Sequence, residues 1–295
     1  MRIAITGGTG FVGRHVAERF NPQDVVIVSR RTGYTLDSVP ELVKAFTESE
    51  IVVHCAGINR ELGDQTYERI HVQGTANVVE AAKQAGVKKI IFMSFLRARP
   101  NCGSPYHESK WAAEEIIRNS GLDYTILKAG MVYGLGDHML DHLSHLMYTI
   151  PFVPTVGFQG KPIRPIPVEE LVDVIVAAIE GRLTKSTVAV VGGEELQLSI
   201  AVKRIATTLG RNILVFPIPI WTQYTASKLF EATMKVPLAA KAQVRILTEG
   251  VSQVAPFGDE LPDDLKPKIK FTREMILKGL PEPGRFTRKD LLFFK

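Results

Sequence analysis

Cysteine, long apolar runs and strong net charge are all scarce in this sequence of 295 residues. Its two cysteines, Cys55 and Cys102, cannot build a disulfide framework or a metal cluster, which favours a reducing, cytoplasmic setting. No run approaches the ~20 apolar residues of a membrane-spanning helix. A glycine-rich turn stands near the N-terminus where a secretory signal would need an apolar stretch. The net charge of +5 is small and dispersed, so we expect no nucleic-acid partner.

Two further features have alternative interpretations. The apolar stretch 213–220 is interrupted by Pro217 and Pro219, and it is either a buried connection or a peripheral contact with a membrane surface. His138, His142 and His145 have helical spacing and could face a metal ion, but a metal hydrolase would need a second ligand cluster. We therefore favour a solvated helix face and predict no metal site.

Short β-branched runs alternate with segments of helical apolar spacing through the first half of the chain. The runs lack polar alternation, as expected for parallel strands that helices cover on both faces. Strands are predicted at 2–6, 25–29, 51–55, 89–94 and 124–128, with a further short strand ending at 36–37. Helices are predicted at 11–20, 39–46, 65–85 and 106–119. The pattern predicts a doubly wound, parallel-sheet α/β fold of the Rossmann type.

Beyond residue 135 the pattern loosens. Helices are predicted at 138–148, 168–180 and 200–209, a strand at 187–191 is expected to rejoin the sheet, and a helical, proline-punctuated tail follows from 221. We therefore predict a dinucleotide-binding Rossmann domain at 1–192, with a lobe insertion around 135–167. A smaller, mostly helical C-terminal lobe at 193–295 would contact a substrate or partner.

The motif Thr6-Gly7-Gly8-Thr9-Gly10-Phe11-Val12-Gly13 leaves the first strand and opens the first helix. Gly7 permits the tight turn, Gly10 lets the backbone approach a pyrophosphate, and Gly13 lets the helix pack closely on the strand. In this context the glycines predict a dinucleotide site.

The second strand ends in Ser29-Arg30-Arg31, where an NAD-selective site would place an acid to bind the adenosine ribose. Two guanidiniums would bind a 2′-phosphate, and Arg14 can point to the same pocket. The alternative is that Arg30 and Arg31 are solvated surface charges. We favour NADP(H) over NAD(H). Asp37 either borders the adenine or caps the helix that begins at Val39.

Tyr106 and Lys110 are four residues apart, so they share one face near the start of a helix that follows the strand ending at Ser94. A nearby ammonium favours the phenolate and would lower the tyrosine pKa, which would equip Tyr106 for proton transfer to or from a carbonyl oxygen. Lys110 can also donate to ribose hydroxyls. This pair predicts a catalytic site.

Taken together, these motifs resemble the short-chain dehydrogenases/reductases, in particular the atypical, extended branch that is similar to NAD-dependent epimerases/dehydratases and includes the nucleotide-binding accessory subunit of respiratory complex I. The resemblance covers about the first 180 residues and is carried by the glycine turn, His54-Cys55-Ala56-Gly57, Gly74-Thr75-Ala76-Asn77, Ser94, Tyr106, Lys110 and Val132-Tyr133-Gly134-Leu135-Gly136-Asp137. It implies Tyr106 and Lys110 as catalytic residues. The coenzyme contacts expected are Gly7, Gly10, Phe11, Val12, Gly13, Arg14, Ser29, Arg30, Arg31, Ala56, Gly57, Ser94 and Lys110.

Three departures from the family pattern leave two functions open. Phe95 and Leu96 follow Ser94 where catalytic members have a hydroxyl that binds the substrate carbonyl, and Lys128-Ala129-Gly130 replaces a frequent Arg-Pro pair. His71 stands at a common asparagine, where it either replaces the asparagine's hydrogen bonds or packs the helix. The chain is then an NADP(H)-dependent oxidoreductase acting on a carbonyl, sugar or quinone-like substrate, or a non-catalytic NADPH-binding scaffold that docks a protein partner.

Overall fold

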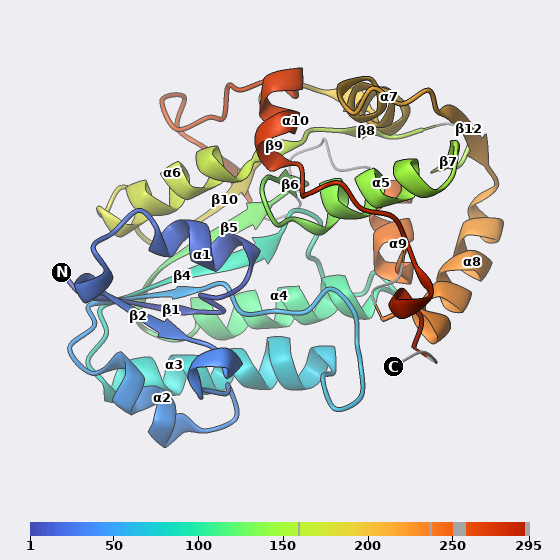
Figure 1. Ribbon diagram of the computed structural model, residues 1–295. Helices are drawn as coiled ribbons and strands as arrows, with labels where there is room; N and C mark the ends of the chain where they lie inside the picture. Colours follow the sequence, from blue (N-terminus) through green and yellow to red (C-terminus); the bar gives the residue numbers. More distant parts are fainter. Residues whose placement is uncertain (159, 236–237, 250–257, 293–295) are drawn as a thin grey trace. The chain divides into compact units, whose positions relative to one another are not determined.

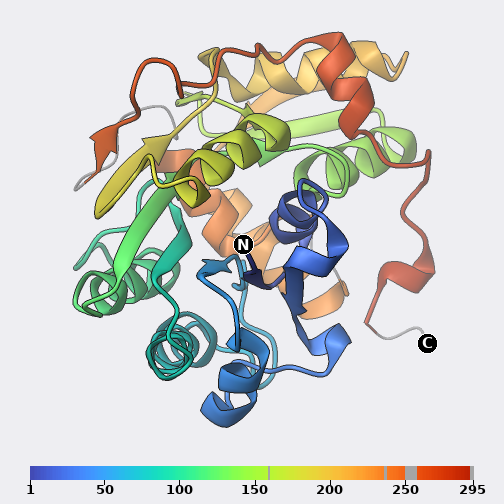
Figure 2. The same cartoon turned by 90° about the vertical axis from the view of Figure 1, so that its left-hand side faces the viewer.

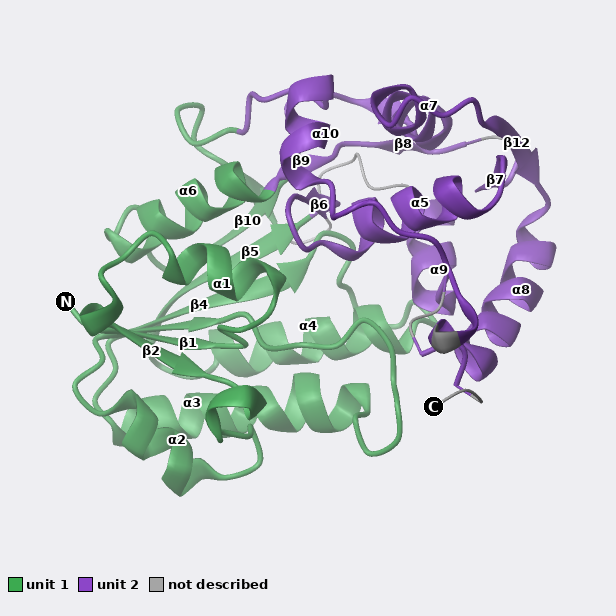
Figure 3. Cartoon of the chain, in the orientation of Figure 1, with its two compact units in different colours: residues 1–129, 168–190, 254–266 green, residues 130–167, 191–253, 267–295 purple. Residues whose placement is uncertain are grey.

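The chain forms two compact units in a computed structural model that describes residues 1–158, 160–235, 238–249 and 258–292. Unit 1 consists of residues 1–129, 168–190 and 254–266, and unit 2 of residues 130–167, 191–253 and 267–295 (Figure 3). Each unit is therefore built from three separate stretches of the chain.

Unit 1 is a parallel sheet of seven strands within the described residues, in the order β13-β10-β5-β4-β3-β1-β2. The strands are β1 (Ile3–Thr6), β2 (Val25–Val28), β3 (Ile51–His54), β4 (Lys89–Phe95), β5 (Asp123–Ala129), β10 (Ser186–Val190) and β13 (Asp259–Glu260). From β1 the chain passes to β2 at one edge of the sheet and then returns to β3 on the opposite side of β1. The strand order therefore reverses between β1 and β3. Ligands of open α/β sheets bind outside the carboxyl ends of the strands at such a reversal.

Helices cover both faces of this sheet (Figures 1 and 2). On one face α1 (Phe11–Ala17) contacts α6 (Val168–Ile179); on the other, α3 (Gly74–Gln84) lies between α2 (Val39–Phe46) and α4 (Pro105–Arg118). Every residue of β1 and β3 is buried, which explains why these strands lack polar alternation. The predicted doubly wound Rossmann fold is confirmed.

Most predicted elements of unit 1 lie within one to three residues of their expected bounds, with three differences. Residues 34–38 form no strand, so the strand at Ile51 is the third along the chain and not the fourth. The helix expected from residue 65 begins as a π-helical turn, η3 (Glu68–Gln73), that continues into α3. The pairing of β13 with β10 was not predicted, because a two-residue strand carries no periodic signal.

Unit 2 is mostly helical, as predicted for the C-terminal lobe. Its helices are α5 (His138–Thr149), α7 (Leu198–Thr208), α8 (Ile220–Thr233), α9 (Lys241–Glu249) and α10 (Arg273–Gly279). Among its described residues, three two-stranded sheets join β6 (Val132–Tyr133) to β9 (Ile166–Pro167), β7 (Phe152–Val156) to β12 (Leu214–Ile218), and β8 (Pro162–Ile163) to β11 (Leu196–Gln197).

The apolar stretch at 213–220 contains strand β12 and is not a wholly buried connection, because Leu214 is 66% exposed. In the part of the chain that the structure describes, no helix is both long enough and apolar enough to cross a bilayer.

Candidate coenzyme and catalytic site

The glycine turn packs tightly against the ends of its neighbours. Gly7 has a left-handed φ of 67°, and a Cβ on it would lie 2.7 Å from the backbone nitrogen of Ala56. A Cβ on Gly13 would lie 2.4 Å from the carbonyl oxygen of Gly7. Side chains are therefore excluded at both positions, as expected of a turn that holds helix α1 close to the sheet.

The middle glycine is different. A Cβ on Gly10 would meet only the Gly7 carbonyl oxygen, at 3.1 Å. Phe11, Val12 and Arg14 are half-buried at the start of α1, and no acidic residue occupies its first turn. The turn thus keeps open backbone beside Gly10 and lacks a carboxylate that would repel phosphate, which fits a bound pyrophosphate.

A buried histidine links the strands on either side of the reversal. Thr6 Oγ1 hydrogen-bonds to Nδ1 of His54 at 2.6 Å, and His54 Nε2 hydrogen-bonds to Thr75 Oγ1 at 3.0 Å. Burial lowers the pKa of His54 to about 3, so the ring is neutral. The sequence indicated His54 only as part of a motif and gave no sign that it joins β1, β3 and α3.

Arg30 and Arg31 lie on an ordered turn directly after β2. The 3-10 turn η2 (Arg30–Thr32) follows Ser29, whose backbone N–H donates to Thr32 Oγ1 at 3.0 Å. Both guanidinium side chains are exposed. The turn therefore presents two positive charges at the carboxyl end of the strand that neighbours β1.

Asp37 does not cap the following helix. Ser38 is the N-cap residue of α2, and no side chain bonds to that helix end. Instead, the Asp37 carboxylate accepts two hydrogen bonds from Arg69, at 2.9 and 3.0 Å, and this partner lowers its pKa. The capping interpretation is wrong, since Arg69 engages both carboxylate oxygens.

Lys110 is buried beside the loops that follow β3 and β4. Its ammonium donates to the Met93 carbonyl oxygen at 3.0 Å, and a Cβ on Gly57 would lie 3.1 Å from its Nζ. Burial lowers the pKa of Lys110 to about 8. The helix thus brings this amine to the carboxyl ends of the strands, as the sequence predicted.

Tyr106 lies one turn earlier on α4, enclosed by aromatic rings. The ring centroids of Phe95, Tyr67 and His71 are 5.5, 5.6 and 5.8 Å from its own. Burial, followed by the neighbouring Tyr67, raises the pKa of Tyr106. The prediction that Lys110 lowers the pKa of Tyr106 is wrong for this structure. Desolvation of the phenolate outweighs any effect of the ammonium.

His71 connects the loop after β3 to helix α4. The backbone N–H of Ile58 donates to His71 Nε2 at 3.0 Å, which leaves the ring proton on Nδ1. Nδ1 lies 2.9 Å from Ser109 Oγ, and that hydroxyl donates to the Tyr106 carbonyl oxygen at 3.0 Å. Burial and Lys110 lower the pKa of His71 to about 2, so it acts as a neutral cross-link. Both predicted roles, hydrogen bonding and helix packing, are combined in one residue.

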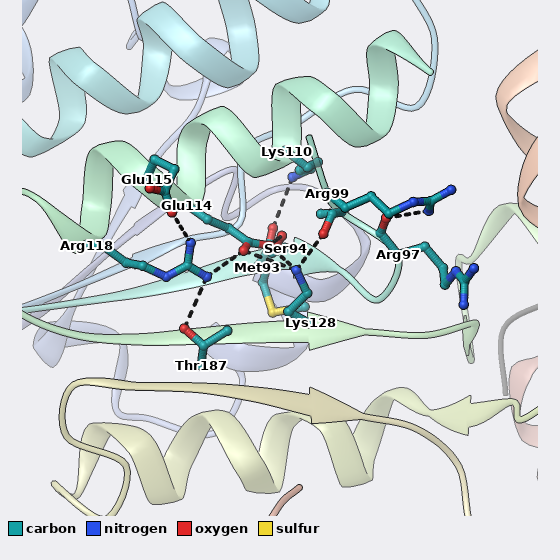
Figure 4. Close-up of polar contacts among 11 residues, drawn as sticks. Met93, Ser94, Arg97, Arg99, Lys110, Glu114, Glu115, Arg118, Lys128 and Thr187 are labelled. Atoms are coloured by element: carbon teal, nitrogen blue, oxygen red, sulfur yellow. Dashed lines mark hydrogen bonds and ion pairs between the residues drawn. The ribbon is translucent and has the colours of Figure 1, made fainter. Parts of the chain in front are cut away.

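Ser94 belongs to a buried ionic network beneath α4 (Figure 4). Its hydroxyl donates to Glu114, whose carboxylate also pairs with Lys128 Nζ at 2.9 Å and with Arg118 at 2.7 Å. Glu114 and Lys128 are both 0% exposed. The Ser94 hydroxyl is therefore engaged by Glu114. In the sequence Lys128 stands out only as a departure from the family pattern and Glu114 carries no signal, because each is identifiable only by its partner.

The histidines of α5 bond within their own helix. Nδ1 of His142 contacts the His138 carbonyl oxygen, and Nδ1 of His145 lies 2.7 Å from the Asp141 carbonyl oxygen. Across the residues described, no three His, Cys, Asp or Glu side chains gather as a metal site would require.

Several known proteins are similar to this chain. An uncharacterised Mycobacterium tuberculosis protein is 23% identical over 81% of the chain, which spans only 27% of that relative's length. Subunit 9 of the mouse mitochondrial NADH dehydrogenase (ubiquinone) 1 alpha subcomplex is 24% identical over 85% of the chain and 72% of its own length. The photosystem II assembly factor Ycf39 of Synechocystis is 25% identical over 74% of the chain and 71% of its own length.

Solved structures share the fold. MoeE5 in complex with UDP-glucuronic acid and NAD superposes with a TM-score of 0.70 at 20% identity, covering 94% of this chain and 97% of its own. The dTDP-4-dehydrorhamnose reductase of Bacillus anthracis in complex with NADP has a TM-score of 0.64 at 21% identity, covering 75% and 85%. The model of the NAD dependent epimerase/dehydratase family matches residues 3–192, which is well over half of the sequence. With its glycine turn, strand reversal and Tyr106–Lys110 helix, the chain belongs to the NAD-dependent epimerase/dehydratase family.

Proposed function

We propose that this chain is an NADP(H)-dependent oxidoreductase that acts on a carbonyl-containing small molecule. The observation that carries the proposal is the position of Lys110. Its buried ammonium is held by the Met93 carbonyl oxygen next to Gly57, and Tyr106 is one turn earlier on the same helix face. A buried amine and phenol at the carboxyl ends of parallel strands suit proton transfer beside a coenzyme.

The residues present fit a pyridine dinucleotide. The open backbone at Gly10, with Phe11, Val12, Gly13 and the tight turn at Gly7, would hold the pyrophosphate. The loop at Ala56 and Gly57, the β4 backbone at Ser94, and Lys110 would line the nicotinamide half. A bound nicotinamide supplies or accepts the hydride.

We propose that Arg30, Arg31 and Arg14 make the site selective for NADP(H) over NAD(H). The fold itself does not decide it, since the similar structures include one in complex with NAD and one with NADP. Exposed guanidiniums directly after β2, with Ser29 as the last residue before them, suit a 2′-phosphate, which an acid at that place would repel.

The proposed chemistry follows from the protonation states. The raised pKa of Tyr106 keeps its phenol protonated at neutral pH, so it holds a proton ready for a carbonyl oxygen that becomes an alkoxide. Lys110 would donate to the ribose hydroxyls of a bound coenzyme and stabilise the phenolate that remains. His71 keeps α4 in place through Ser109. With Tyr106 protonated, carbonyl reduction can proceed directly, whereas alcohol oxidation would first require Tyr106 to lose its proton. The protonation states therefore favour reduction.

The test compares the parent with Tyr106→Phe for NADPH oxidation across aldehydes, ketones, nucleotide sugars and quinones. We expect a parent activity that falls by about a hundredfold or more in Tyr106→Phe, while NADPH affinity measured by calorimetry is retained. Activity that Tyr106→Phe leaves unchanged refutes the role given to the tyrosine.

A second candidate is a non-catalytic NADPH-binding scaffold for a protein partner. The observation that favours it is the Phe95 ring packed 5.5 Å from the Tyr106 ring, directly after Ser94 where a substrate-binding hydroxyl was expected. A relative named as an assembly factor is compatible with this function. A panel without turnover, combined with NADPH binding that raises the unfolding temperature, would favour the scaffold.

A reducing, cytoplasmic location is also proposed. Cys55 and Cys102 are not joined in a disulfide, and burial raises the pKa of Cys55 to about 12, so this thiol stays protonated and unreactive. Labelling with a thiol reagent under denaturing conditions, directly after cell lysis, tests the proposal, which requires both cysteines to be recovered as thiols.

A further inference from the structure

Helix α8 buries polar side chains and exposes large apolar ones. Its two buried residues are polar, Gln223 at 9% and Ser227 at 0% exposure, whereas Trp221 is 70% and Leu229 is 60% exposed. Helices of soluble domains normally show the opposite arrangement. A helix that buries polar groups and exposes large apolar ones is informative, because isolated exposed apolar residues are ordinary but an inverted face is not.

The exposed residues form one stripe along α8, which we call the α8 outer face. It consists of Trp221, Thr225, Lys228, Leu229 and Ala232, whose spacing of four, seven, eight and eleven residues from Trp221 follows the helical repeat. Large apolar side chains alternate here with an ammonium.

Further exposed apolar groups lie at the start of this helix. Ile220 is 43% exposed, and a Cβ on Gly157 would lie 3.4 Å from its side chain. Phe158, the next residue after Gly157, is 71% exposed. The exposed side chains of Phe158, Ile220 and Trp221 therefore belong to segments that meet where β7 and β12 end and α8 begins.

Unit 2 also carries the whole net positive charge of the chain, because only there do basic residues outnumber acidic ones. It has 17 lysines and arginines against 9 aspartates and glutamates, a net charge of +8, while unit 1 has 19 against 22, a net charge of −3. The total of +5 therefore conceals a basic unit and a mildly acidic one. Such asymmetry between parts of a chain suggests an anionic surface as partner of the basic part.

We propose that the α8 outer face binds peripherally to a bilayer containing anionic lipids. Tryptophan and leucine would enter the boundary between headgroups and acyl chains, and Lys228 would stay among the lipid phosphates. With 14 residues, α8 is about 21 Å long, shorter than the ~30 Å hydrocarbon core, so it lies in the plane of the interface. A second copy of this basic unit would repel the first, which favours an anionic lipid surface as the occupant.

The experiment measures binding of the full chain to vesicles by flotation. We expect binding to mixed phosphatidylglycerol–phosphatidylcholine vesicles and about tenfold weaker binding to phosphatidylcholine alone. Trp221→Ala combined with Leu229→Ala should weaken binding by at least about tenfold. Brominated acyl chains should quench tryptophan fluorescence in the parent and lose that effect in Trp221→Phe.

Two matched controls separate the α8 outer face from general effects. Lys203→Glu on α7 changes the net charge of unit 2 as much as Lys228→Glu does, and Leu277→Ala removes an apolar side chain that is 49% exposed on α10. The proposal requires Lys228→Glu and Leu229→Ala to weaken vesicle binding more than these controls.

Three results overturn the proposal: no binding to anionic vesicles, equal loss in variants and controls, or binding that survives the Trp221→Ala, Leu229→Ala change. Dissociation of a parent oligomer or protein complex by that double variant, without vesicle binding by the parent, would assign the face to a protein instead.

Discussion

Replacement of Lys128 by methionine tests whether the buried ionic network supports unit 1. Methionine retains most of the aliphatic stem and removes the ammonium, so the change leaves the Glu114 carboxylate buried without its closest lysine. Lys128 and Glu114 are both 0% exposed, and Nζ lies 2.9 and 3.1 Å from the two carboxylate oxygens. The Ala98 carbonyl oxygen, 2.8 Å from Nζ, also loses its donor.

Breaking one side of a buried ion pair costs about 3–5 kcal/mol. Arg118 remains 2.7 Å from Glu114 and still compensates part of its charge, so we expect a loss of about 3 kcal/mol in the free energy of unfolding. Urea denaturation followed by circular dichroism measures this loss. In the double variant Lys128→Met, Glu114→Gln, part of the lost free energy of unfolding should be recovered, because the second change removes the unpaired charge.

The single variant Glu114→Gln completes the cycle. Burial already lowers the pKa of Lys128, and loss of the Glu114 charge lowers it further, so the lysine can lose its proton in this variant. Its cost should therefore be smaller at alkaline pH than at neutral pH. A Lys128→Met variant within about 0.5 kcal/mol of the parent, or a double variant that is less stable than either single one, would refute this reasoning.

Three other predictions concern the glycine turn, the arginine pair and one buried acid. Gly10→Val should fold normally yet lose NADPH binding in calorimetry, whereas Gly13→Ala should lower the unfolding temperature, because its Cβ would lie 2.4 Å from a backbone oxygen; equal effects of the two changes would contradict this. Arg30→Ala with Arg31→Ala should weaken NADPH about ten- to a hundredfold and leave NADH unchanged, and equal parent affinities for both coenzymes would rule this out. Burial raises the pKa of Asp137 to about 6, above its value in the unfolded chain. The protonated carboxyl therefore contributes its full stabilisation below about pH 4, and this contribution is lost as the pH rises through 6. The unfolding free energy of the parent relative to Asp137→Asn should then fall by about 3 kcal/mol between about pH 4 and pH 7, and a constant difference would show that the carboxyl does not titrate this way.

Local sequence patterns determined the framework of the candidate coenzyme site. The strand, glycine turn and helix at the N-terminus could be predicted because their signals are contiguous and the glycines are required by backbone geometry. The spacing of Tyr106 and Lys110 likewise follows from the helical repeat alone. Even the length of α2, from Val39 to Phe46, was predicted to the residue.

Only the tertiary structure decided how the side chains at this site are charged and bonded. The pKa of Tyr106 depends on rings from two other segments, η3 with its N-cap and β4, and the Ser94 hydroxyl is engaged by Glu114, twenty residues away. The proton of His71 is located by a backbone N–H that no sequence pattern marks. Desolvation and long-range hydrogen bonds depend on which segments meet in space, whereas periodicity reports only which residues share a strand or helix face.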